Sequence, residues 1–230
     1  MPDSTRPVRR RVARCLTLAL ALPAGCAGAP APVLTWIDAD FDDLDAFALP
    51  AAMTAGGSGT AGGDAAHWYA APDGSDGSPR CLRVDAPGST GQQFHVLLTT
   101  APFATRDLRL SVRIRADAGE EDQGGGLCWR ALDHDDYYIA RWNPLEDNVR
   151  LYTVVGGVRT MLANADVDVP HDGWHRLGVA VQGAHLTVLL DDEALFSVRD
   201  TTFAGTGRVG LWTKADASTS FDDLVVRRLD

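Results

Sequence analysis

Apolar and polar residues alternate along several stretches of the chain, and this period of two constrains the fold more than any other feature. It is clearest over 108–115, where leucine, valine and isoleucine alternate with arginine and serine. The same alternation recurs over 176–181, 185–190 and 208–212. Successive side chains of a strand point to opposite faces, so each stretch predicts a strand with one buried face and one more polar face.

Turn-forming residues separate these stretches, as in Pro72-Asp-Gly74, His171-Asp-Gly173 and Ala204-Gly-Thr-Gly207. No ten-residue window shows a convincing helical period. Short strands with regular turn signals predict an all-β sandwich or barrel, and we interpret the chain as one antiparallel β-sandwich over 36–230. Residues 51–64 are rich in Ala, Gly, Ser and Thr and are expected to form a flexible excursion.

The first 25 residues are typical of a secretory signal peptide. Five arginines precede the apolar run 15–22, and small residues follow it up to Cys26. The run is too short to span a bilayer, which needs about 20 apolar residues. Leu22-Pro-Ala-Gly-Cys26 also resembles a lipobox, in which Cys26 would be acylated, although Pro23 departs from the usual pattern. We therefore expect an extracytoplasmic protein, lipid-anchored at Cys26 or secreted, with 26–35 as a linker; a cytoplasmic location is the remaining alternative.

The charge balance argues against nucleic acid as a partner. The chain has 21 Lys and Arg against 31 Asp and Glu, a formal net charge of −10. Binding to a polyanion needs a basic face, and removal of the arginine-rich signal would leave the domain more acidic still. All the basic residues are arginines except Lys214, an ammonium that differs chemically from a planar guanidinium. Lys214 is either a functional donor or a chance retention.

Four cysteines give no metal-binding pattern. Cys15 and Cys26 belong to the predicted signal region, which leaves Cys81 and Cys128 in the domain. Two cysteines of an exported protein can form a disulfide or stay free, and the sequence leaves both outcomes open. No spacing of Cys or His is typical of a zinc site.

The phrase Phe-Asp-Asp-Leu occurs twice, at 41–44 and at 221–224. The first and last strands of a jelly roll commonly pair, so the two acidic pairs are expected to lie close together. Clustered carboxylates suit Ca²⁺, which takes six to eight oxygen ligands, and Asp40, Asp42 and Asp222 are the candidates for a structural calcium site. The alternative is that these carboxylates only solvate edge strands.

Polar and aromatic residues fall on the non-core parity of several strands in the second half of the domain. If these strands share one sheet, its open face carries arginine, asparagine, tyrosine, tryptophan and lysine together. Amide and guanidinium groups bind sugar hydroxyls in pairs and aromatic rings stack on sugar C–H surfaces, so the face predicts a glycan or small-saccharide site. The alternative is that these side chains only solvate the sheet. The candidate ligand-binding residues are Gln123, Arg130, Arg141, Asn143, Asn148, Arg150, Tyr152, Trp212 and Lys214.

Several segments together resemble a bacterial branch of the concanavalin A-like lectin/glucanase superfamily, near the 3-keto-disaccharide hydrolase family that is often labelled family 16 glycoside hydrolase-like. The resemblance covers about residues 36–230. Its most specific phrases are Leu-Glu-Asp-Asn-Val at 145–149 and Leu-Trp-Thr-Lys-Ala-Asp at 211–216. It implies a two-sheet antiparallel jelly-roll sandwich, with any glycan site on the concave sheet.

The two carboxylates of a retaining glycanase are absent as a motif, since no Glu-x-Asp-x-Glu or Glu-x-Asp-x-x-Glu spacing occurs. The chemistry that the resemblance implies, elimination beside a keto group, needs only one base and a stabiliser of the developing anion. Glu146 or Asp122 would be the base, with Lys214, Arg141 or Arg150 as stabiliser. Three functions stay open: glycan binding without catalysis, 3-keto-glycoside cleavage, and a structural or interaction role in the cell envelope.

Overall fold

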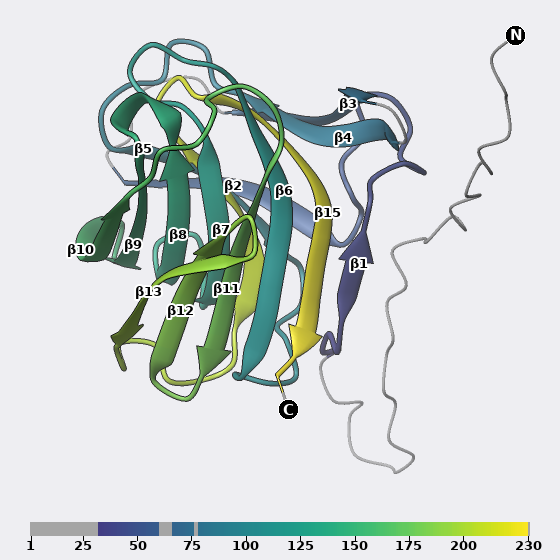
Figure 1. Ribbon diagram of the computed structural model, residues 1–230. Coiled ribbons are helices and arrows are strands. Elements are labelled where there is room, and N and C mark those ends of the chain that lie inside the picture. Colours follow the sequence, from purple (N-terminus) through teal and green to yellow (C-terminus); the bar gives the residue numbers. More distant parts are fainter. Residues whose placement is uncertain (1–31, 60–65, 76–77, 230) are drawn as a thin grey trace, which may run out of the picture.

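The computed structural model of the protein describes residues 32–59, 66–75 and 78–229. They form two antiparallel β-sheets that pack face to face, with connections that run over the ends of the sandwich (Figure 1). The two-sheet antiparallel sandwich predicted from the sequence is confirmed. The predicted signal peptide, residues 26–31 of the predicted linker, Cys15 and Cys26 lie outside the described residues.

The first sheet has the strand order β13-β12-β11-β6-β15-β4-β3, and β1 pairs with β15 beside this path. Its strands are β1 (Ile37–Ala39), β3 (His67–Ser75), β4 (Ser78–Asp85), β6 (Leu108–Ala118), β11 (His175–Gln182), β12 (His185–Leu190), β13 (Glu193–Arg199) and β15 (Ser218–Arg228). The pairing of β1 with β15 places Ala39 opposite Leu224. The expected meeting of the first and last strands is therefore confirmed.

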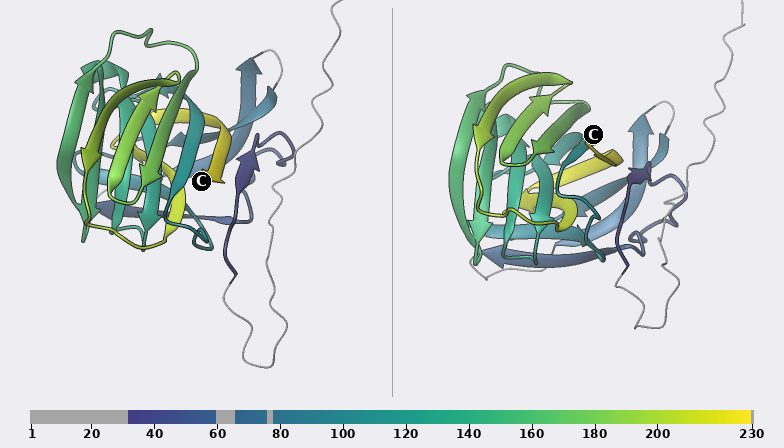
Figure 2. Two further views of the ribbon diagram at one scale, coloured as in Figure 1. Left: turned by 60° about the horizontal axis from the view of Figure 1, so that its bottom comes forward. Right: turned by 90° about the horizontal axis from the view of Figure 1, so that it is seen from below.

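The second sheet has the order β10-β9-β8-β7-β14-β5-β2. Its strands are β2 (Met53–Gly59), β5 (Gln93–Thr99), β7 (Gly125–Ala131), β8 (Tyr137–Asn143), β9 (Asn148–Val155), β10 (Val158–Asp166) and β14 (Arg208–Lys214). A single 3₁₀ turn, η1 (Pro144–Glu146), joins β8 to β9. This sheet is strongly curved in the two views of Figure 2.

The main core lies between the sheets and follows the predicted alternation. On β6, Leu108, Leu110, Val112 and Ile114 are buried, and they pack with residues of the second sheet such as Trp129. Full burial of an aliphatic side chain of this size contributes roughly 1.5–3 kcal/mol. The core therefore determines which face of each strand points away from the opposite sheet. No helix in the described ranges is long and apolar enough to cross a membrane.

The glycine-rich segment expected to be flexible contains a strand, which corrects that prediction. Residues Met53–Gly59 form β2, paired with β5 along its whole length. β2 runs behind the strands of the second sheet in Figure 1, and small residues let it pass close to loops that belong to other strands. A Cβ at Gly56 would lie 2.5 Å from the ring of His134, and one at Gly157 would lie 3.2 Å from the amide nitrogen of Gly59.

Because the second sheet curls in this way, its outer face, turned away from the first sheet, carries a second apolar cluster. The cluster is buried although it lies outside the main core. It consists of Phe94, Val96, Leu98, Cys128, Ala131, Tyr137, Ile139, Tyr152, Val154 and Trp212. The outer face of this sheet is thus apolar at its centre, and polar groups gather toward the end of the strands near η1.

Cys81 and Cys128 are both free and both buried. Cys81 lies on β4 of the first sheet and Cys128 on β7 of the second, so the disulfide that the sequence left open is not formed.

Candidate binding site on the outer face of the second sheet

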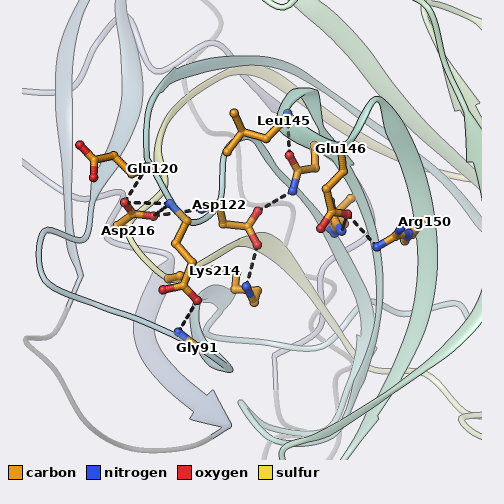
Figure 3. A network of polar contacts seen from close by, with 12 residues as sticks. Gly91, Glu120, Asp122, Leu145, Glu146, Arg150, Lys214 and Asp216 are labelled. Carbon is orange, nitrogen blue, oxygen red and sulfur yellow. Dashed lines mark hydrogen bonds and ion pairs between the residues drawn. The ribbon is translucent and has the colours of Figure 1, made fainter.

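Five of the predicted ligand-binding residues gather at the η1 end of the second sheet. Arg141 on β8 lies opposite Arg150 on β9. Two residues further along the same pair of strands, Asn143 lies opposite Asn148. Lys214 ends β14 on the other side of β7. Figure 3 shows two neighbouring sets of polar contacts, one around Asp122 and one around Glu146, which together we call the polar group.

Lys214 and Asp122 form the buried part of this group. The Lys214 Nζ lies 2.8 Å from Asp122 Oδ2, and the Asn143 Nδ2 donates to Asp122 Oδ1 at 2.8 Å. The loop before β7 is fixed by Asp216, whose carboxylate accepts hydrogen bonds from the backbone amides of Glu120 and Asp122. Both oxygens of Asp122 are therefore committed inside the fold.

Glu146 forms the exposed part. Its Oε2 accepts hydrogen bonds from Arg141 Nη2 and Arg150 Nη1, both at 2.7 Å, and from Asn148 Nδ2 at 3.2 Å. Partial burial raises the pKa of Glu146, but the hydrogen bond and charge of Arg141, together with Asn148 and Arg150, outweigh it and lower the pKa overall. The Glu146 side chain is 44% exposed. It is a carboxylate held in one orientation at the surface.

This arrangement is poorly suited to proton abstraction. A general base works best when its pKa lies near the working pH, and the pKa of Glu146 is shifted the other way. Asp122 is buried, and each of its carboxylate oxygens already accepts a bond, from Asn143 or from Lys214. Of the two acids that the sequence offered as bases, Asp122 lies in internal contacts and Glu146 is paired with two arginines at the surface.

Arg141 is the least satisfied polar group of the site. Its side chain is 2% exposed, and only Nη2 reaches Glu146. Within the part of the chain that the structure describes, its Nε and Nη1 have no hydrogen-bond partner. Buried donors without partners are uncommon in native proteins, so the N–H groups on these two nitrogens are candidates for binding a further acceptor.

Sequence reasoning missed Arg159 and Asn164 on the edge strand β10. Arg159 lies with its guanidinium 4.3 Å from the centre of the Tyr152 ring, and Asn164 Oδ1 accepts a hydrogen bond from Arg150 Nε at 2.8 Å. The pairing of β10 with β9 shifts register between Met161 and Ala163. Because that bulge interrupts the period of two, strand parity gave no signal for these residues.

The two aromatic candidates lie on the predicted face but are covered. Trp212 is 1% exposed, packs against Phe94 and donates from Nε1 to Tyr137 Oη at 3.1 Å. Tyr152 is also buried and lies beneath Arg159. Their rings belong to the second apolar cluster rather than to an open stacking surface.

Arg130 and Gln123 lie apart from the group. Arg130 has a positive φ of 48° at the end of β7, and its guanidinium donates to the carbonyl oxygens of Arg106, Gly183 and Phe203. Gln123 Nε2 donates to the carbonyl oxygen of Gly119. The structure gives both side chains roles in holding loops.

The three candidate calcium ligands do not form a metal-binding group. Asp40 Oδ1 accepts a hydrogen bond from the amide of Asp42 at 3.2 Å, whereas the buried Asp222 lies 3.0 Å from Arg113 Nη1. Among the described residues, no three His, Cys, Asp or Glu side chains are placed to hold a metal ion.

Comparison with known proteins gives matches to solved structures only. No family model and no curated protein matches the chain. The carbohydrate-binding module CBM66 from Bacillus subtilis matches with a TM-score of 0.56 at 20% identity, over 64% of this chain and 86% of the module. A Bacillus subtilis protein of unknown function with a galectin-like fold matches with a TM-score of 0.54 at 10% identity, over 76% and 89% of the two chains.

A third similar structure is the exoplasmic/lumenal domain of VIP36 in its Ca²⁺/Man-bound form. Its TM-score is 0.52 at 13% identity, over 77% of this chain and 83% of that domain. The chain therefore has the concanavalin A-like β-sandwich fold that the sequence predicted. At these identities the matches define the fold alone, and the resemblance to the 3-keto-disaccharide hydrolase family stays a prediction.

Proposed function

We propose that the protein is an exported module that binds a glycan or small saccharide through the outer face of its second sheet, without cleaving it. Glu146 is the observation that carries this proposal. Two arginines and an asparagine hold its Oε2, while Oε1 accepts no hydrogen bond from any residue that the structure describes. A fixed, half-exposed carboxylate oxygen of this kind is an acceptor for sugar hydroxyls.

The neighbours of Glu146 supply the matching donors. The side chain of Arg150 is 29% exposed, and its guanidinium is oriented by Asn164 as well as by Glu146. A planar guanidinium beside a carboxylate binds adjacent hydroxyl groups in pairs, and its orientation by the protein reduces the entropy lost on binding. The fold adds support, because the solved structures that resemble this chain include a carbohydrate-binding module and a lumenal domain in a mannose-bound form.

Export is proposed from the sequence alone, through the arginine-rich segment, the apolar run and Cys26. Expression in a bacterial host followed by fractionation tests it. We expect the chain in the membrane fraction through the lipid, and a Cys26→Ser variant outside the membrane fraction. Recovery of full-length, unprocessed chain in the cytoplasm would overturn this part of the proposal.

A glycan array followed by titration calorimetry tests the binding. We expect at least one class of glycan to bind, and Glu146→Gln and Arg150→Gln each to weaken that binding by at least about tenfold, which corresponds to about 1.4 kcal/mol. Glu193→Gln on β13 of the first sheet is the matched control, because Glu193 is also exposed and lies on another sheet. Equal affinity of Glu146→Gln and the wild type would exclude this site.

A further inference from the structure

Four basic side chains lie on the outer face of the second sheet in a chain that is acidic overall. They are Arg141, Arg150, Arg159 and Lys214, and the acids paired with them are Asp122 and Glu146. Glu120, Glu121 and Asp216 lie nearby, in the loop contacts around Asp122. Asp122 neutralises Lys214, and Glu146 is shared by Arg141 and Arg150. The remaining guanidinium, that of Arg159, forms no ion pair with any described residue. The face thus carries cationic groups that the fold itself does not neutralise.

Arg159 extends from the edge strand β10 over the aromatic cluster. Its guanidinium carbon lies 4.3 Å from the ring centre of Tyr152, 5.2 Å from that of Phe94 and 5.8 Å from that of Trp212. Its Nη1 is buried and has no partner among the described residues. Burial lowers the pKa of Arg159, and the like charge of Arg141 adds to this effect.

Arg141 contributes the other donors. Its Nε and Nη1 are buried without partners on the same face, two positions from Ile139 of the apolar cluster. A guanidinium cannot lose its charge in a protein, so both groups remain cationic donors. Arg159 lies over Tyr152, and Tyr152 pairs with Ile139, two residues from Arg141, so the two arginines are neighbours on one face. An anion that accepts hydrogen bonds from both would offset their like charges.

We propose that Arg141 and Arg159 bind the anionic group of an acidic saccharide, a carboxylate or a sulfate ester. This inference rests on the proposed function, because it assigns the class of sugar to the same face. Arginine binds two oxygens of a carboxylate or of a tetrahedral oxyanion through two parallel N–H bonds, and such charge-assisted bonds are stronger than those to neutral hydroxyls. Glu146 and Arg150 bind the hydroxyl groups of the sugar, and Arg141 and Arg159 bind its charge.

Affinity gel electrophoresis of the full chain at physiological salt tests the inference with two matched pairs. One pair is polygalacturonate and its carboxyl-reduced, neutral derivative; the other is dextran sulfate and dextran. We expect the apparent affinity to be at least tenfold higher for the acidic member of one pair. The pair that shows this difference identifies the anionic group as a carboxylate or as a sulfate ester. The net charge of −10 works against non-specific attraction to either polyanion.

Variants of Arg159 separate this inference from the function it rests on. Arg159→Met keeps the packing on the aromatic rings, and we expect it to abolish the preference for the acidic member. We expect Arg159→Lys to keep part of this preference. Arg199→Gln, on the first sheet, is the control and is expected to keep all of it. Thermal unfolding checks that each variant folds. Equal affinity for both members of each pair, or no binding of either acidic member, overturns the inference. Binding of neutral glycans that depends on Glu146 would in that case leave the proposed function standing.

Discussion

Lys214 lies 2.8 Å from Asp122, and this ion pair connects the end of β14 to the loop before β7. Both side chains are at most a tenth exposed, and Asn143 bonds the second oxygen of the carboxylate. The pair accounts for the one lysine of an arginine-rich chain: a compact ammonium on a flexible stem fits a buried carboxylate where a planar fork would need more acceptors. Lys214 therefore has a structural role, as the partner of the buried Asp122.

We expect Lys214→Met to lower the free energy of unfolding by about 3–5 kcal/mol, because it leaves the charge of Asp122 buried with Asn143 alone. The double variant Lys214→Met, Asp122→Leu is expected to recover most of that loss, since it removes both charges together. Denaturant titration measures both. A single variant within 1 kcal/mol of the wild type would show that the pair is exposed or dispensable in solution.

Strand parity predicted a large part of this structure, and its failures have physical causes. It placed the alternating aliphatic residues of 108–114 in the core and brought Arg141, Asn143, Asn148 and Arg150 to one face. It failed at Arg130, because a residue with positive φ at the end of β7 turns the side chain out of the alternation. It also failed on β10, where a bulge between Met161 and Ala163 interrupts the period of two.

Strand parity also did not predict that the two aromatic candidates are buried. Parity correctly assigned Trp212 and Tyr152 to the non-core face but could not show that this face is covered. The cover comes from Arg159 on β10 and from the curl that brings β2 close to loops of other strands, which are contacts distant in sequence. The pairing of Glu146 with two arginines is local, since Arg141 and Arg150 lie five and four positions away, but it depends on the conformation of η1 between β8 and β9, which strand parity does not predict.

Asp222 is expected to make stability depend on pH. Burial, and then the charge of Asp223, raise the pKa of Asp222 from 3.8 to about 7 despite the nearby Arg113. The folded chain keeps this proton where the unfolded chain releases it, so the contribution is full below about pH 4 and is lost as the pH rises through about 7. The loss is at most about 1.4 kcal/mol per pH unit.

Urea titrations of the wild type and of Asp222→Asn between pH 4 and pH 8 measure this effect. The variant cannot titrate at that position, so its free energy of unfolding minus that of the wild type is expected to increase up to about pH 7 and then level off. A difference that stays flat over this range would mean that Arg113 keeps Asp222 ionised throughout.

The two domain cysteines are expected to be unreactive in the native state. Burial raises the pKa of Cys81 and raises that of Cys128 well above its ordinary value, and thiolate is the reactive form. In a Cys15→Ser, Cys26→Ser chain, a thiol reagent should label neither cysteine at pH 8 and both in denaturant without reductant. Failure to label either in denaturant would instead indicate a disulfide between them.

A glycine at position 126 is expected to be required for the close approach of β7 to β8. A Cβ at this position of β7 would lie 2.0 Å from the carbonyl oxygen of Ala140 on β8, and that backbone cannot move without breaking the pairing that holds Arg141. We expect Gly126→Ala to lower the free energy of unfolding by about 1–3 kcal/mol, the range for overpacked sites. Strain at this point should also weaken glycan binding.

Gly178→Ala on β11 is the matched control, because the nearest atom to a Cβ there is 3.5 Å away on Leu189, an ordinary contact. Alanine in place of a strand glycine without a clash is expected to be neutral or to stabilise by about 0.5–1 kcal/mol. Denaturant titration compares the two. Equal effects would contradict this prediction. They would show that the close approach of β8 to β7 at Gly126 does not limit stability.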